Sequence, residues 1–338
     1  MLTSPQLMFP LHPALINIYF GIATYKYFIE IIKSFLPSKT FKASLLLLNW
    51  MSILILSSTE DPASTNMKRY LLENLEWNDI GEIYSNRAYR CRDTDAFLVT
   101  INDPLIYHEE VDEEIRKHLG IDFDLMIVLS RHRSKTEEPT LTTHPIGNFG
   151  KAEFGGRDRT LVKTSPRMMT QFLRLLKEEA RRRKLYHRVS FEVTHHGPFV
   201  STKTFFVEVG SNEREWNNPS AVEAVANSVK ELLLNFRSEE DLPSYPVLIG
   251  VGGGHYAPRF SDLAFEKRVA FGHMIPNYQV EAGNIDDAMI RKCIDATPGF
   301  EGVYIHRKGL KKSRAKELEM RLKEMGVRIY RSDDLEDL

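Results

Sequence analysis

The sequence predicts an α/β protein with a central mixed, largely parallel sheet. From residue 51 onward, short apolar runs alternate with longer segments whose apolar residues recur at helical spacing. SILIL (52–56) and PVLIGV (246–251) are runs of the first kind, and SPRMMTQFLRLLKEEARRRKL (165–185) is a segment of the second kind. This alternation favours a sheet covered by helices, and a hydrophobic content of 42% supplies apolar residues for its core.

Each element has local support. Strands are predicted where β-branched and aromatic residues gather, and helices where apolar spacing combines with start and stop signals. The helix at 108–120 has acids early, Lys117 and His118 late, and Gly120 as its stop. The predicted strands are 52–56, 82–92, 96–101, 125–130, 189–193, 204–209, 246–251 and 302–307, and the predicted helices are 66–75, 108–120, 165–185, 221–236 and 313–326.

The first fifty residues differ from the rest. Their two apolar patches are interrupted by Lys26 and Asn49, so neither gives a clean membrane span. An amphipathic appendage, a weak membrane anchor and an upstream translation start are three interpretations of this region. The chain is accordingly divided into an N-terminal extension (1–50), one main domain (51–332) and an acidic tail (333–338).

Charge and cysteine content narrow the classes of function. A net charge of −1 argues against a protein that coats nucleic acid with its whole surface, so any RNA contact must come from local basic patches. Cys91 and Cys293 are far apart in the sequence and form no CxxC, which argues against a disulfide framework and a thiolate zinc site. This cysteine usage suits a reducing compartment, so we expect a cytoplasmic protein that does not bind a membrane.

The stretch EVTHHGPFVSTKTFFVEVG places acids and histidines among residues that favour strands. In extended strands Glu192 and His196 share one face, and so do Phe206, Glu208 and Gly210. A hairpin between the two predicted strands would bring Glu192 close to Glu208. Buried carboxylates are costly unless they are paired, bound to metal or catalytic. We therefore expect a divalent metal site or an acid/base pair here.

Glycines and histidines at other predicted strand ends extend the candidate site. A buried strand runs directly into Gly252, Gly253 and Gly254, which are followed by His255. At the carboxyl end of a parallel strand, glycines let backbone N–H groups approach a ligand. The run VAFGHMIP adds His273 at the end of another apolar segment.

The segment 130–156 follows a predicted strand and is rich in glycine. We expect it to lack regular secondary structure, and a loop of this length is more often functional than not. Its candidate site residues are His132, His144, Asn148 and Lys151, and its candidates for binding phosphate are Arg131 and Lys135.

Basic residues cluster twice. The cluster 181–184 closes a predicted helix, where the helix dipole alone can explain cations. The cluster 307–316 lies at a predicted helix start, where cations are unfavourable, so an anionic partner explains it better. The candidates for binding RNA are Lys308, Lys311 and Lys312.

Six motifs together resemble the archaeal- and plant-type D-aminoacyl-tRNA deacylase family. They are SRHRSK, LTTHPIGNFGKAEFGG, FEVTHHGP, FFVEVGSNEREW, GVGGGHYAP and AFGHMIP, in this order within 51–332. The resemblance implies a zinc-dependent hydrolase that frees tRNA from D-amino acids. It also implies a three-layer α/β/α fold, similar in part to peptidyl-tRNA hydrolases and nucleoside phosphorylases. One departure is Phe149, where the family commonly has tryptophan.

The resemblance and the residues together suggest roles. An aminoacyl ester is already activated, so polarisation of its carbonyl by zinc and a metal-activated water are sufficient. Glu208 is the expected general base, His195 a further catalytic residue, and Asn148 or Lys151 the expected oxyanion donor. The resemblance implies two zinc ions, charged tRNA as partner, no DNA binding and a monomer. The expected ligands or their supporting residues are His132, His144, Glu192, His196, His255 and His273.

Two other functions remain open from the sequence. The same histidines would serve a metal-dependent amidase or peptidase. A tRNA-binding protein without catalytic activity is the second alternative. The sequence contains no HExxH and no GxSxG, so the common protease and esterase schemes lack support.

Overall fold

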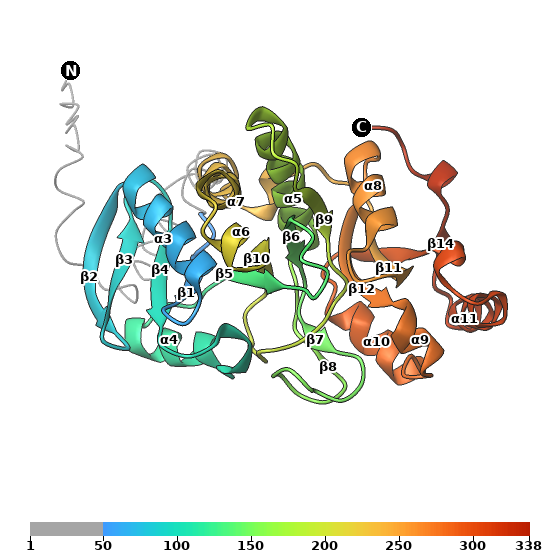
Figure 1. Cartoon of the computed structure of the whole chain (residues 1–338). Helices are drawn as coiled ribbons and strands as arrows, with labels where there is room; N and C mark the ends of the chain where they lie inside the picture. Colours follow the sequence, from blue (N-terminus) through green and yellow to red (C-terminus); the bar gives the residue numbers. More distant parts are fainter. Residues whose placement is uncertain (1–49) are drawn as a thin grey trace, which may run out of the picture. The chain divides into compact units, whose positions relative to one another are not determined.

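Two β-sheets organise residues 50–338, which are the residues that the computed structural model describes (Figure 1). The extension predicted for residues 1–50 lies outside this part of the chain except for Trp50. No helix within residues 50–338 has both the length and the apolar character needed to cross a membrane.

The larger sheet has eight strands and is mixed and largely parallel, as predicted. β4, β1, β5 and β10 run parallel to one another, β6 joins β10 in antiparallel orientation, and β9 joins β6 in parallel. β1 and β5 are buried on both faces, which explains their continuous apolar runs. In order across the sheet, the strands are β2 (Trp77–Ile83), β3 (Asn86–Cys91), β4 (Ala96–Ile101), β1 (Ile53–Ser58), β5 (Leu125–Arg133), β10 (Thr204–Ser211), β6 (Thr140–His144) and β9 (Arg188–Phe191).

The predicted hairpin between residues 189–193 and 204–209 does not form. β6 lies between β9 and β10 and pairs with both, so Glu192 and Glu208 approach each other from either side of β6. The segment 130–156, for which we expected no regular structure, supplies the end of β5 and all of β6 and β7. The missing hairpin and the unexpected strands have one cause, because the threonine-rich run TLTTH forms β6, a buried strand inside the sheet.

The smaller sheet has four parallel strands and carries the glycine motif. Gly252 and Gly253 end its strand β11. The backbone N–H of Val193, which follows the strand β9 of the larger sheet, donates a hydrogen bond of 2.9 Å to the carbonyl of His255, two residues after Gly253. This contact brings the end of β11 to the end of β9. The strands are β12 (Ala270–Pro276), β11 (Val247–Gly253), β13 (Phe300–Ile305) and β14 (Ile329–Tyr330), and a separate antiparallel pair consists of β7 (Gly147–Asn148) and β8 (Thr160–Leu161).

Helices cover both faces of the larger sheet, which makes the three layers expected (Figure 1). In β1, Ile53 and Ile55 pack in the core that contains α3, α5 and α7, whereas Leu54 and Leu56 pack in the core that contains α4. This alternation follows from the two-residue repeat of a strand. The helices are α3 (Pro62–Asn74), α4 (Val111–Leu119), α5 (Pro166–Arg182), α6 (Glu213–Trp216), α7 (Pro219–Asn235), α8 (Pro258–Glu266), α9 (Asn277–Glu281), α10 (Asp287–Asp295) and α11 (Lys312–Glu324).

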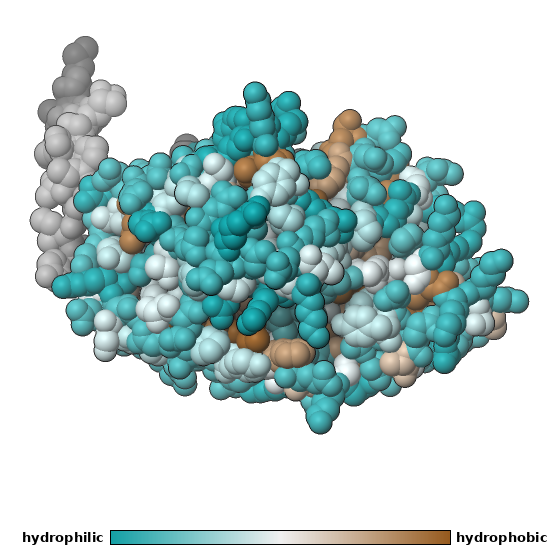
Figure 2. All heavy atoms as spheres, viewed as in Figure 1, coloured by the Kyte–Doolittle hydropathy of each residue, from teal (hydrophilic) through white to brown (hydrophobic). Residues whose placement is uncertain are grey.

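The acidic residues at 333–338 are packed against the domain. Leu335 is buried, Glu336 pairs with Arg268 at 3.0 Å, and Asp337 pairs with Lys267. Figure 2 shows that the outer surface on this side is mostly hydrophilic, with small separate apolar patches.

Candidate metal centre

Seven ionisable side chains converge where the two sheets meet. They come from strand ends and from the connections that follow them, as is usual for binding sites of α/β sheets. Two are carboxylates with almost no solvent exposure, 0% for Glu192 and 3% for Glu208. The cluster consists of His132 at the end of β5, His144 at the end of β6, Glu192, His195 and His196 after β9, Glu208 in β10, and His255 after β11.

The strand β10 centres the cluster. Its residue Glu208 lies opposite Ser130 of β5 and Thr142 of β6, and two residues later Gly210 lies opposite His132. A Cβ atom at Gly210 would lie 2.7 Å from the Cβ of His132, so glycine is required for this histidine to pack across the strand. The alternation predicted for this strand therefore places its acid and its glycine on the face of the site.

The carboxylates lie close to the imidazoles. His132 Nδ1 is 3.1 Å from Glu192 Oε1 and 3.4 Å from Glu208 Oε2, and His144 Nε2 is 3.6 Å from Glu208 Oε1. Glu192 Oε2 is 3.3 Å from His255 Nε2 and 3.6 Å from His195 Nε2. Glu192 thus contacts three imidazoles, and Glu208 contacts two.

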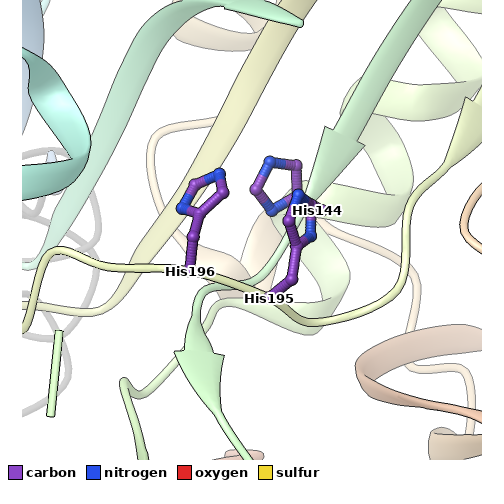
Figure 3. Close-up of side chains that lie close together, drawn as sticks. All are labelled: His144, His195 and His196. Carbon is purple, nitrogen blue, oxygen red and sulfur yellow. The ribbon is translucent and has the colours of Figure 1, made fainter. Parts of the chain in front are cut away.

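His144, His195 and His196 lie close together (Figure 3), and a backbone carbonyl fixes the orientation of each ring. Nδ1 of His144, His195 and His196 lies 3.1, 2.7 and 2.6 Å from the carbonyls of Pro145, Val193 and Gly197, respectively. Each Nδ1 therefore carries the proton that it donates, and each Nε2 is left as the nitrogen that the backbone does not use. Backbone carbonyls fix metal-ligating histidines in proteins in the same way.

Several buried polar atoms of the cluster lack a hydrogen-bond partner among the described residues. They are His144 Nε2, both carboxylate oxygens of Glu192 and Glu208 Oε2. A buried polar atom without a hydrogen bond is costly in free energy. These atoms have oppositely charged side chains within 4 Å but make no hydrogen bond with them. Acceptor atoms that converge without bonding one another have the arrangement of metal ligands, so the residues present fit a divalent cation.

The electrostatics of the cluster are balanced without a metal. Burial lowers the pKa of His132, but Glu192 and Glu208 outweigh it and raise this pKa to about 10. Burial raises the pKa of Glu208, but His144 and His132 hold it well below its usual range. Burial and His144 lower the pKa of His196 to about 4. The carboxylates are therefore ionised and matched by protonated imidazoles, whose protons a bound cation would replace.

Known proteins resemble this chain over most of its length. The family profile described as D-aminoacyl-tRNA deacylase matches residues 119–330. A D-aminoacyl-tRNA deacylase of Methanosarcina mazei is 33% identical over 294 residues, which cover 86% of this chain and 95% of the relative. The chain belongs to the D-aminoacyl-tRNA deacylase family.

Further comparisons agree with this membership. A D-aminoacyl-tRNA deacylase of Pyrococcus horikoshii is 36% identical over 272 residues, which cover 78% of this chain and 96% of the relative. A crystal structure of AF0625, a conserved protein of unknown function, superimposes with a TM-score of 0.74 at 30% identity and covers 85% of this chain and 98% of that one. The deacylase family and its α/β fold are thus confirmed.

One predicted ligand does not belong to the cluster. Nδ1 of His273 lies 3.1 Å from the hydroxyl of Thr194, and its Nε2 lies 2.9 Å from the carbonyl of Val162. Burial lowers the pKa of His273 to about 4, so the ring is neutral and both nitrogens are already used. The structure therefore does not bring His273 into the cluster, where it was predicted as a ligand or supporting residue, but places it against Thr194, the residue before His195.

The predicted oxyanion donors border the cluster. Asn148 lies in β7 and its Nδ2 donates a 2.9 Å hydrogen bond to the carbonyl of Gly155. The preceding Gly147 N–H donates to the carbonyl of His196 at 2.8 Å, which ties this strand to the cluster. Lys151 has an exposed side chain in the loop that follows.

The residues predicted to contact substrate lie in separate parts of the domain. Arg131 is half-buried and stacks on Trp216, and Lys135 is exposed. Gly252 and Gly253 are buried at the end of β11, and Gly254 is exposed. Among the predicted RNA contacts, Lys311 already pairs with Glu281 at 2.9 Å. Lys308 and Lys312 are exposed at the start of α11.

Supporting residues were missed from the sequence. The Tyr256 hydroxyl lies 3.2 Å from His132 Nε2, and the Trp216 indole donates to the carbonyl of His132 at 2.9 Å. Asp61 accepts the backbone N–H of Arg131 at 2.8 Å. Tyr256 directly follows a predicted ligand and could have been included, whereas nothing local marks Trp216 or Asp61 as neighbours of β5.

The loop after β7 packs tightly against the connection after β9. A Cβ atom at Gly155 would overlap the carbonyl oxygen of Ile106, and one at Gly197 would overlap the backbone of Gly156. The Glu109 carboxylate joins the two segments, because it accepts the N–H groups of Gly156 at 2.6 Å and Phe199 at 2.9 Å. This packing holds His196 in place.

Gly155→Ala should lower the free energy of unfolding by about 2–4 kcal/mol, through overpacking and a left-handed backbone. The residue has φ of +70° and no space for a methyl group. Gly326→Ala is the matched control, with φ of +72° and nothing within 4 Å of its Cβ position. We expect Gly326→Ala to lower the free energy of unfolding less, because it adds only the cost of a left-handed backbone. Chemical denaturation measures this free energy for both variants. Equal losses in the two variants would contradict the packing argument.

Proposed function

We propose that this protein hydrolyses the ester bond between a D-amino acid and the 3′-terminal adenosine of tRNA. The observation that carries the proposal is the convergence of seven histidine and glutamate side chains, whose buried acceptor atoms lack partners among the described residues. The curated relatives over most of this chain are named D-aminoacyl-tRNA deacylase, which supports the substrate.

The same proposal includes two zinc ions. The cluster contains three overlapping sets of three residues whose ligand atoms lie within 4.8 Å of one another, and two of these sets share no residue, whereas the third (His144, Glu192 and Glu208) joins them. Imidazole and carboxylate suit zinc, and three protein ligands per ion are typical of catalytic zinc sites. Bound zinc supplies Lewis acidity for an ester carbonyl and lowers the pKa of water. One set is His144, His195 and His196, the other is His132, Glu192 and His255, and Glu208 lies between the two.

The chain's own residues supply positioning and proton transfer. Glu208 is nearly fully buried and ionised, so it can hold a proton taken from water. Asn148 would have to exchange its bond to Gly155 in order to donate to an oxyanion, whereas the exposed Lys151 is free to move. An aminoacyl ester is already activated, and these modest contributions are enough for its hydrolysis.

We further propose that the protein acts as a monomer in the cytoplasm and binds tRNA rather than DNA. Cys91 and Cys293 are both buried and free, which suits a reducing compartment. Removal of D-amino acids from tRNA there would keep them out of translation.

The test is hydrolysis of one tRNA charged with either the D- or the L-form of the same amino acid. We expect the D-ester to react about tenfold faster or more, because one steric clash in a fitted pocket is worth about 1–3 kcal/mol. Rates are measured from the loss of acid-precipitable label. Turnover of small amides with inert D-aminoacyl-tRNA would instead indicate an amidase. Purified protein with no metal and no hydrolysis of either ester would indicate a tRNA-binding protein without catalytic activity.

A further inference from the structure

Two aromatic residues near the metal centre have more than half of their surface exposed to solvent. Phe154 is 59% exposed and Tyr107 is 53% exposed, although most large apolar side chains of the described residues are buried. A Cβ atom at Gly155, the residue after Phe154, would lie 3.3 Å from Tyr107 Cδ1, so Tyr107 packs beside the backbone that follows Phe154. The two exposed residues are here called the Phe154–Tyr107 pair.

Phe154 belongs to the loop between β7 and β8, which protrudes at the lower edge in Figure 1, between α4 and α10, whereas Tyr107 ends the short 3-10 turn Leu105–Tyr107 that precedes α4. The loop is anchored on both sides. Arg157 pairs with Glu110 at 2.7 Å beside α4, and Arg159 pairs with Asp286 at 2.7 Å at the start of α10. An anchored loop holds its exposed side chains at a fixed place, which lowers the entropic cost of binding a ligand there.

The same loop touches the metal centre. The carbonyl of Phe154 accepts the N–H of Gly197 at 2.9 Å, and Gly197 directly follows His196. A molecule whose reacting bond lies at the cluster and whose remainder extends outward over this loop would therefore pass the Phe154–Tyr107 pair. A tRNA ends in unpaired nucleotides beyond the ester, so their flat bases are the groups that this loop would meet.

We propose that the Phe154–Tyr107 pair stacks against the unpaired bases at the 3′ end of tRNA. This inference rests on the proposed function, because it places the ester at the cluster. Exposed aromatic rings stack on any nucleobase, and each stack contributes about 1–3 kcal/mol. Lys151, three residues before Phe154 in the same loop, is exposed and supplies a cation for the phosphates of an RNA strand.

Three of the nearby acids are used within the protein, whereas Glu153, directly before Phe154, is exposed. Asp158 accepts the N–H of Ala152 at 2.7 Å, and the Glu109 carboxylate accepts two backbone N–H groups, so both are used within the protein. Glu110 is paired with Arg157.

The experiment is a double-mutant cycle between protein and RNA. Binding of uncharged tRNA is measured by fluorescence anisotropy for wild-type protein and for Phe154→Leu, which keeps an apolar side chain without a π face. Each protein is titrated with complete tRNA and with the same tRNA lacking its terminal CCA. We expect Phe154→Leu to weaken binding of complete tRNA about fivefold or more, and to leave binding of truncated tRNA unchanged.

Two further variants complete the test. Phe154→Trp should keep wild-type affinity, and Met320→Ala, an equally exposed apolar residue on α11, should not change it. Unchanged affinity of Phe154→Leu for complete tRNA, or an equal loss with both tRNAs, would overturn the proposal. Failure of the proposed function is separate, because it shows as absent hydrolysis by wild-type protein whatever the binding cycle gives. Matching melting temperatures and metal contents exclude misfolding.

Discussion

A Glu208→Gln variant should lose about 10³-fold in kcat/KM for D-aminoacyl-tRNA, because metal sites contribute several kcal/mol of charge stabilisation. The carboxylate lies between His132 at 3.4 Å and His144 at 3.6 Å and is only 3% exposed. Glutamine keeps its shape but removes the negative charge that holds divalent cations in a buried site. We therefore expect zinc content, measured by elemental mass spectrometry, to fall together with the rate.

Glu179→Gln is the matched control for this change. Glu179 is 4% exposed, lies on α5 and pairs with Arg182 and Arg183 outside the cluster. Its variant should keep the activity and metal content of wild-type protein. A Glu208→Gln protein that stays within tenfold of wild-type activity would contradict the assignment of Glu208 to the centre. Full zinc content with a lost rate would show that Glu208 acts as a base and is not a ligand.

Removal of metal by a strong chelator should abolish hydrolysis and lower the melting temperature by several degrees. A ligand at one hundred times its Kd stabilises the folded state by about 2.7 kcal/mol, and each kcal/mol shifts Tm by about 2–4 °C in a domain of 150–250 residues. The physical reason is that His144 Nε2 and the Glu192 oxygens have no hydrogen-bond partner among the described residues, so a cation bound there would satisfy them. Zn²⁺ should restore both rate and Tm, whereas Mg²⁺, which prefers oxygen ligands, should not.

The measurement pairs scanning fluorimetry with the hydrolysis assay. Glu208→Gln is the control protein, because a variant that binds no metal should show no further shift with chelator. Turnover that persists in a chelator, with no detectable zinc in the protein, would refute the zinc assignment. The deacylase assignment would then still be decided by the comparison of D- and L-esters.

The residues of β10 show how far local pattern reaches. Its alternation predicted that Phe206, Glu208 and Gly210 share a face, and the structure has Phe206 stacked on His144 with ring centroids 5.3 Å apart, Glu208 in the cluster and Gly210 against His132. Successive side chains of a strand point to opposite faces of the sheet, so the face that each residue occupies can be inferred from that strand alone. The four histidine-bearing segments were likewise recognised from their positions at strand ends.

The order of strands could not be inferred in the same way. Residues 189–193 and 204–209 are neighbours in sequence and were expected to pair, but the sheet places β6 between them. Beyond Phe191 the chain also leaves the extended conformation, and His196 has φ of +47°. Strand order depends on which faces the helices bury across the whole domain, and no short segment contains that information.

The sequence by itself determined the α/β class, the family and most elements, and all seven residues of the cluster were among its site candidates. Only the tertiary structure decided which histidines have a free nitrogen. His273 gives both nitrogens to Val162 and Thr194, whereas His144 keeps Nε2 unpartnered among the described residues. The physical reason is that a histidine's role depends on the acceptors that surround it, and those come from elements far away in the chain.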